Sequence, residues 1–163
     1  MGTNNYNELL KFKKATEKLE KLKQFYTSKE LANKVADEAI KQIRKRTRLG
    51  YGVSNGRRTR LKPLSEDYKK TRRKMKGLSR DARPNKSNLT LTGDMLDNME
   101  HKLKKKITSM IITLGADNAL NRDKMEWVSE DRPFMGLTKA ELRLLNDLIF
   151  EEVKKAMKAL KLV

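Results

Sequence analysis

The chain of 163 residues contains no cysteine, a single histidine and a single tryptophan. Without cysteine it can form no disulfide, use no thiolate nucleophile and build no zinc site with sulfur ligands. With one histidine it also lacks the histidine-rich motifs of many metal sites. These absences exclude several common classes of enzyme and metalloprotein before any element is assigned.

Long apolar runs are also missing. No stretch approaches the roughly 20 apolar residues that a membrane helix needs, and the first residues lack the apolar segment of a secretion signal. Hydrophobic residues make up 37% of the chain and the mean hydropathy is −0.82. We therefore expect a soluble protein without membrane contact, made in the cytoplasm.

Signatures of catalysis are absent as well. The sequence has no phosphate-binding glycine loop and no Gly-x-Ser-x-Gly element. Asp94, Asp97 and His101 have a spacing that would place three metal ligands on one helical face, but no further ligand cluster accompanies them. We expect no enzymatic activity, no metal and no cofactor.

Positive charge is what the chain has in excess, and it is concentrated in one segment. The formal net charge is +18. Residues 41–86 contain 18 Lys and Arg against 3 acidic side chains, a net charge of +15, which leaves +3 for the rest. Such a segment attracts polyanions with an affinity that falls as salt rises.

Nucleic acid is the obvious polyanion, although aromatic stacking residues are scarce in this segment. The alternative is a solvated loop whose charge aids solubility or contacts acidic protein neighbours. The residues that we expect to contact DNA or another polyanion are Arg44, Arg46, Arg57, Arg58, Arg60, Arg72, Arg73 and Lys74.

Apolar periodicity predicts helices over 5–26, 28–46, 66–76 and 139–160, with Thr27 and Glu30 as a capping box for the second. Residues 100–105 and 107–115 are expected to pair as a hairpin. The fold class is therefore α+β, a small antiparallel sheet packed against a long helix in the N-terminal half and a C-terminal helix. We expect a helical arm over residues 1–27 and one domain over 28–163, with an extended basic loop at 44–88.

A short loop, residues 132–138, precedes the last helix. Thr138 and Glu141 have the spacing of a capping box, while Pro133 and Gly136 favour a turn. Phe134 and Met135 then lie on a connection, where a large apolar side chain needs a partner surface. Phe134 either packs into the chain's own core or contacts another protein.

Several motifs occur in an order that resembles one protein family. These are Leu-Lys-Pro-Leu-Ser at 61–65, Leu-Thr-Gly at 91–93, a strand ending in Leu-Gly at 114–115, and Arg-Pro-Phe-Met-Gly-Leu-Thr at 132–138. Over residues 28–160 the chain resembles the virion morphogenesis family of tailed bacteriophages, which includes tail-completion and neck proteins. Residues 116–130 depart from the family pattern, which there commonly has a Tyr-Ala and a His-Gln-x-Gly-like stretch.

The resemblance implies a structural virion protein at the junction of head and tail, a connector or tail-completion subunit that forms a sixfold or twelvefold ring around the DNA channel. Portal, adaptor or tail proteins would be its neighbours, and double-stranded DNA would pass the basic segment without being read for sequence. The expected contacts to a partner or a second copy are Arg132, Phe134, Met135 and Trp127, with Phe134 as a knob in a neighbour's pocket. The alternative is a small basic nucleic-acid-binding module.

Overall fold

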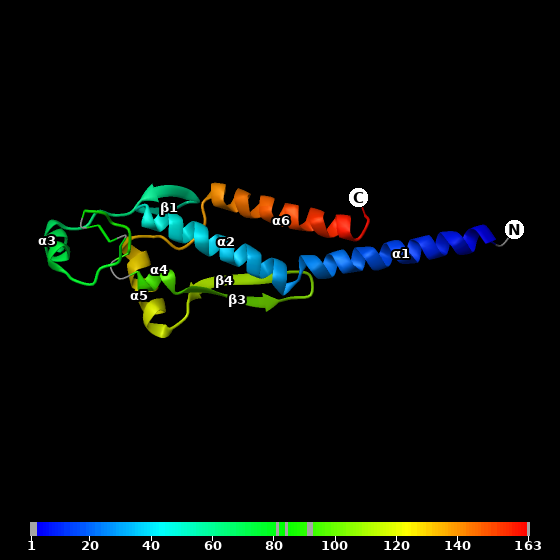
Figure 1. Ribbon diagram of the computed structural model, residues 1–163, viewed down its shortest axis with the longest axis horizontal. Helices are drawn as coiled ribbons and strands as arrows, with labels where there is room; N and C mark the ends of the chain where they lie inside the picture. Colours follow the sequence, from blue (N-terminus) through cyan, green and yellow to red (C-terminus); the bar gives the residue numbers. More distant parts are fainter. Residues whose placement is uncertain (1–2, 81, 84, 91–92, 163) are drawn as a thin grey trace.

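The computed structural model describes residues 3–80, 82–83, 85–90 and 93–162. The elements in order are α1 (Thr3–Tyr26), α2 (Lys29–Arg48), β1 (Tyr51–Ser54), β2 (Arg57–Arg60), α3 (Glu66–Lys74), α4 (Asp94–Asp97), β3 (Met99–Lys105), β4 (Met110–Ala116), α5 (Ala119–Asp131) and α6 (Lys139–Ala159). The molecule is elongated, with α1 extending from one end and α3 at the other (Figure 1). The predicted α+β class is confirmed.

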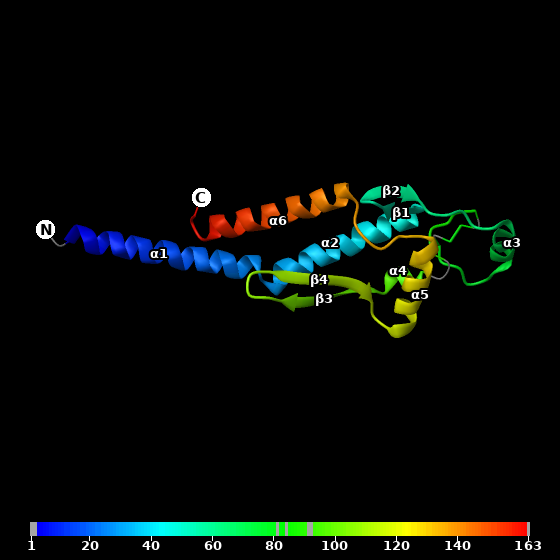
Figure 2. The same ribbon diagram turned by 180° about the vertical axis from the view of Figure 1, so that it is seen from behind.

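Helix α2 is the central element, with α6 on one side and the β3–β4 hairpin on the other (Figures 1 and 2). Ion pairs join the start of α2 to the later part of α6, Lys34 to Glu152 at 2.7 Å, and the end of α2 to the start of α6, Arg46 to Glu141. The two helices therefore run antiparallel.

The start of α2 differs from the prediction. Ser28 is the N-cap and accepts a 3.2 Å hydrogen bond from the Leu31 amide, so the capping box of Thr27 and Glu30 is wrong. The Thr27 hydroxyl instead donates back to the Lys23 carbonyl oxygen at the end of α1.

The strands form two separate antiparallel hairpins, β1 with β2 and β3 with β4. The second was predicted, whereas residues 51–60 were expected to be loop. Asn55 and Gly56 connect β1 to β2 with φ angles of 50° and 68°, the left-handed backbone of a tight hairpin turn. Within the expected basic loop at 44–88, the end of α2 and helix α3 agree with the helices predicted at 28–46 and 66–76, whereas the hairpin β1–β2 was not predicted.

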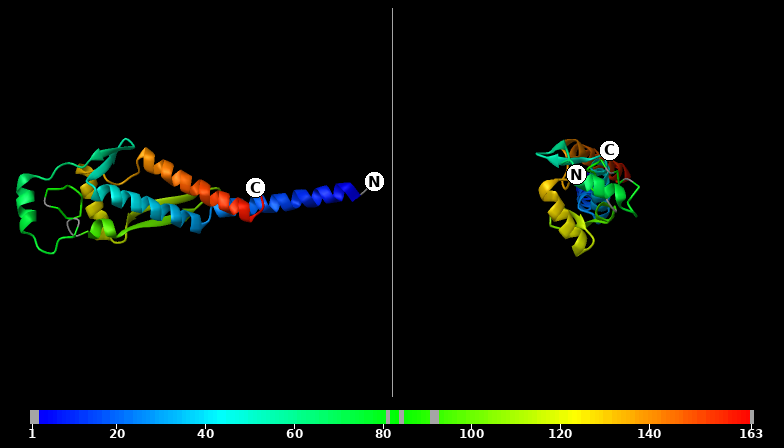
Figure 3. Two further views of the ribbon diagram at one scale, coloured as in Figure 1. Left: turned by 45° about the horizontal axis from the view of Figure 1, so that its top comes forward. Right: turned by 90° about the vertical axis from the view of Figure 1, so that its left-hand side faces the viewer.

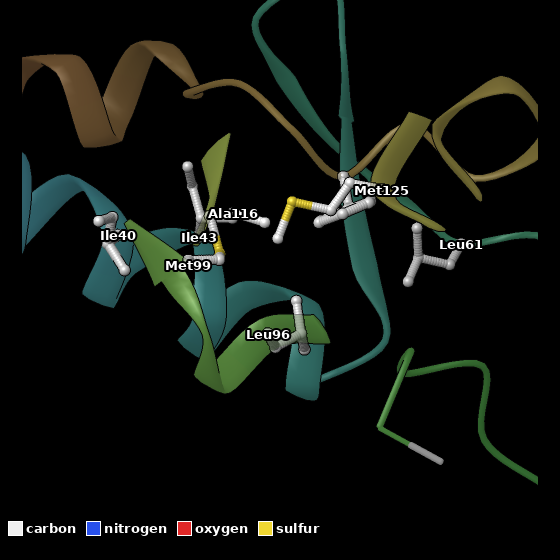
Figure 4. Close-up of a cluster of buried hydrophobic side chains, with 8 residues drawn as sticks. Ile40, Ile43, Leu61, Leu96, Met99, Ala116 and Met125 are labelled. Atoms are coloured by element: carbon white, nitrogen blue, oxygen red, sulfur yellow. The ribbon is translucent and has the colours of Figure 1, made fainter. Parts of the chain in front are cut away.

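The main core lies around the C-terminal half of α2 (Figure 4). Its buried apolar side chains come from α2, α4, β3, β4, α5, the residue after β2 and the 132–138 loop: Ile40, Ile43, Leu61, Leu96, Met99, Ala116, Met125 and Phe134. The 132–138 loop thus belongs to the core although it has no regular structure.

Gly52 of β1 lets this loop approach the hairpin closely. The Val53 amide donates a 2.8 Å hydrogen bond to the Pro133 carbonyl oxygen. A Cβ atom at residue 52 would lie 2.1 Å from that oxygen and 2.8 Å from the Leu61 side chain. Only glycine permits this contact.

We predict that Gly52→Ala destabilises the fold by about 1–3 kcal/mol or more, because the loop must move away from β1. Gly115→Ala is the matched control, since a Cβ there would meet nothing within 4 Å. Urea unfolding of both variants measures the difference. Equal stability of the two variants would show that the approach at residue 52 is not constrained.

Candidate functional site

The 132–138 loop ends in the predicted capping box. The Thr138 hydroxyl accepts a 3.2 Å hydrogen bond from the Glu141 amide, and Glu141 Oε2 accepts one of 2.7 Å from the Thr138 amide. This prediction is confirmed, and it fixes where α6 begins.

One guanidinium holds the loop in place. Arg46, only 4% exposed, donates from Nη2 to the carbonyl oxygens of Phe134 and Gly136, at 2.6 and 3.0 Å, and from Nη1 to the Glu141 carboxylate. Burial lowers the pKa of the guanidinium, and the Glu141 carboxylate opposes that shift. Arg46 was predicted to contact DNA, but its charge is used inside the fold.

Phe134 is fully buried, so the prediction that it is a knob for a neighbouring subunit is wrong. The loop turns its ring into the chain's own core, which was the alternative. Met135 is half-buried and packs against the same core, and Arg132 Nε donates to the Lys62 carbonyl oxygen at 3.3 Å. Of the four expected partner contacts, only Trp127, with 76% of its surface exposed, is wholly available.

Two further cations that were predicted to contact a polyanion, Arg44 and Arg72, have structural roles. Arg44 donates to the carbonyl oxygens of Leu96, Asp97 and Met99, at 2.6, 2.7 and 3.2 Å, which ties α2 to α4 and β3. Arg72 is 2% exposed and donates to the Lys86 carbonyl oxygen at 3.1 Å, so its predicted DNA contact is also wrong. Burial lowers the pKa of Arg72.

The other predicted cations are exposed but dispersed. Arg57, Arg58 and Arg60 lie on β2, where the Arg58 guanidinium stacks 3.6 Å from the centre of the Tyr51 ring. Arg73 and Lys74 lie on α3 at the end of the molecule (Figure 1), with Arg73 bonded to Asn85 at 3.0 Å. These residues do not form one site.

A basic groove of about 730 Å³ lies between the C-terminal half of α2 and the segment 83–88. It is lined by Lys41, Arg44, Lys45, Arg48, Leu49, Arg83, Lys86 and Asn88. Among the residues that the structure describes, no carboxylate lines it, although Asp97 pairs with Arg48 from nearby. Closely spaced cations around a concave surface suit the phosphates of a polyanion.

Of the residues that line the groove, only Arg44 was among the residues predicted to contact a polyanion. The sequence could have predicted the α2 side of the groove. Residues 41, 44, 45 and 48 have three- and four-residue spacing and therefore share one face of that helix. The pairing of that face with Arg83 and Lys86 is a tertiary contact that spacing does not reveal.

The sole histidine has neighbours but no metal site. His101 lies on β3, with Nε2 at 2.9 Å from Asn33 Oδ1 and Nδ1 at 3.6 Å from Asp37 Oδ1. Over the described residues, no three His, Asp or Glu side chains are placed to hold a metal ion.

Leu91 and Thr92 of the Leu-Thr-Gly motif lie outside the described residues. Within the described ranges, no helix combines the length and apolar character needed to cross a membrane. Comparison of the chain with protein-family models, curated proteins and solved structures finds no match.

We predict that Arg46→Ala destabilises the protein by about 3 kcal/mol or more, because it leaves the Glu141 carboxylate without its cation and removes the donor to the carbonyl oxygens of Phe134 and Gly136. Lys45→Ala, an exposed cation one residue earlier, should change stability by less than about 0.5 kcal/mol. Chemical denaturation compares them. Similar stabilities for the two variants would contradict a structural role for Arg46.

We also predict that Phe134→Ala costs about 3–5 kcal/mol, because it opens a cavity in the core. Phe150→Ala, the same change at a side chain that is 67% exposed, should have little effect on unfolding of the monomer. Thermal unfolding at low protein concentration tests both. If the Phe134→Ala protein is as stable as the parent, Phe134 does not stabilise the core and is again a candidate for contact with a partner.

Proposed function

We propose that this protein is a structural virion subunit at the head–tail junction of a tailed bacteriophage, a neck, connector or tail-completion protein that assembles as a ring around the DNA channel. Two observations support this proposal: the motifs resemble those of the virion morphogenesis family, and the chain exposes more surface than a compact monomer does. The observation on which this proposal rests is the large surface of the single chain.

The solvent-accessible surface is 11809 Å². A compact monomer of 18.9 kDa exposes about 8300 Å², so this chain exposes roughly 40% more. Excess exposed surface does not stabilise a free monomer, whereas a subunit of an assembly buries such surface against its neighbours.

The excess lies largely on helices. Between residues 11 and 26 of α1, no side chain is buried, and on α6 only Leu145 is. Leu142, Leu144 and Phe150 of α6 are between 42% and 67% exposed. Apolar helical surface of this extent favours lateral contacts with other copies or with portal, adaptor and tail proteins.

Electron microscopy together with a mass measurement in solution tests this proposal. We expect a closed ring, sixfold or twelvefold, whose mass is a whole multiple of the chain's. A protein that remains monomeric at every accessible concentration would contradict it.

The basic groove favours a second candidate, a small nucleic-acid-binding module, and it would also serve a channel subunit that contacts DNA phosphates. Binding of this kind depends on phosphates and not on base sequence, so it falls steeply with salt. The two candidates differ in assembly, because a binding module needs no ring.

For DNA contact at the groove, we predict that Lys45→Glu combined with Lys86→Glu weakens binding of double-stranded DNA and lowers the slope of log affinity against log salt by roughly 2. Lys154→Glu combined with Lys158→Glu makes the same charge change on α6 and is the control. Filter binding over a salt series measures both. If the two pairs behave alike, the groove is not the DNA contact.

A further inference from the structure

Helix α1 has an apolar stripe that the described part of the chain leaves largely exposed. Phe12, Leu19 and Tyr26 are 73%, 58% and 55% exposed and lie seven residues apart. Ala15 and Leu22 occupy the intervening positions that complete a heptad seam. Residues at this spacing lie along one side of a helix, so α1 presents a seam to a partner helix.

The seam has basic flanks over residues 11–26. The flanking heptad positions, one residue before and four residues after each stripe residue, are Lys11, Lys18, Phe25, Thr16 and Lys23. Lys18 also bonds to the Lys161 carbonyl oxygen, and Lys23 lies 3.7 Å from the exposed Glu20. Two α1 helices paired with each other would bring lysines together, which disfavours self-pairing.

Helix α5 has the complementary surface. Leu120 and Trp127 are 64% and 76% exposed and are also seven residues apart. The charged positions between and beside them are four carboxylates, Asp123, Glu126, Glu130 and Asp131, and two cations, Arg122 and Lys124, so α5 carries a net charge of −2. Asp131 lies 3.0 Å from Lys62, and both side chains are more than half exposed.

Helix α5 is long enough to lie along most of the α1 stripe. The stripe runs for about 21 Å from Phe12 to Tyr26, the 13 residues of α5 span about 20 Å, and the exposed pair Leu120 and Trp127 covers about 11 Å of that length. They cannot meet within one chain, because α1 extends from one end of the molecule and α5 lies toward the other (Figures 1 and 2). Figure 3 shows α5 standing out from the side of the body, where a neighbour can reach it.

We propose that α1 of one copy packs on α5 of the next, with Phe12, Leu19 and Tyr26 against Leu120 and Trp127, and lysines against carboxylates. The contact joins two different surfaces and so repeats head to tail, which closes into a ring when the rotation between copies allows it. This inference rests on the proposed function and names the interface that it requires.

Cross-linking tests the contact directly, because the natural chain has no cysteine. Ala15→Cys and Lys124→Cys are placed in separate chains, near the middle of α1 and α5, and the mixture is treated with a bismaleimide. We expect a covalent pair that joins residue 15 of one copy to residue 124 of another, identified by mass spectrometry. Either variant alone should give little product.

The strength of the contact is tested with Trp127→Ala, which should weaken self-association by roughly 30-fold, as expected for a central aromatic anchor. Ile107→Ala removes an apolar side chain that is 92% exposed in the connection between β3 and β4 and should leave assembly unchanged. Analytical ultracentrifugation over a concentration series measures both.

The outcomes separate this inference from the proposed function. Closed rings without the 15–124 cross-link, or with a cross-link only between two copies of residue 15, overturn the α1–α5 contact and leave the ring intact. Cross-linked open chains support the contact and contradict the closed ring. A monomeric protein overturns both.

Discussion

The buried guanidinium of Arg46 is the constraint on which the rest of the fold depends. It lies at the end of α2, forms an ion pair with the Glu141 carboxylate that caps α6, and donates hydrogen bonds to the carbonyl oxygens of Phe134 and Gly136. These bonds set the direction of the 132–138 loop, so they place the Phe134 ring in the core and start α6 antiparallel to α2. A cation is suited to this position because a loop without regular structure has carbonyl oxygens that need donors when they are buried.

This role divides the cations of residues 41–86 into two groups. Arg44, Arg46 and Arg72 bind backbone oxygens and hold α2, the 132–138 loop and α3 in place, whereas Lys41, Lys45 and Arg83 of the groove and the arginines of β2 are exposed. The net charge of the segment therefore overstates the charge available to a polyanion. The binding of backbone oxygens also explains why the buried cations are arginines. The planar guanidinium binds two oxygens at once, whereas lysine offers only a point charge.

The sequence predicted the long helices, the β3–β4 hairpin and the cap at Thr138, because these depend on local periodicity and local hydrogen bonds. It missed β1–β2, whose strands have only four residues and no apolar alternation, although Asn55-Gly56 is a recognised hairpin turn. The burial of Arg46 had a signal as well, since it follows Ala39 and Ile43 on the apolar stripe of α2. For Phe134 the sequence left two possibilities, the core or a partner surface, and could not decide between them because the loop's contacts, Gly52 and Arg46, are more than 80 residues away in the chain.

The distribution of burial also explains why the molecule is long. The core occupies one end, around the second half of α2, and the helices continue beyond it with few buried side chains. A helix with the composition of α1 gains little from its own hydrogen bonds in water, so its stability depends on packing against other surfaces. α6 supplies part of that packing, and the Lys161 carbonyl oxygen just after α6 accepts a hydrogen bond from Lys18, but Phe12, Leu19 and Tyr26 remain exposed. In the assembly that we propose, α5 of a neighbouring copy, with its exposed Leu120 and Trp127 and its net negative charge, would cover this stripe and complete the burial of apolar surface that folding begins.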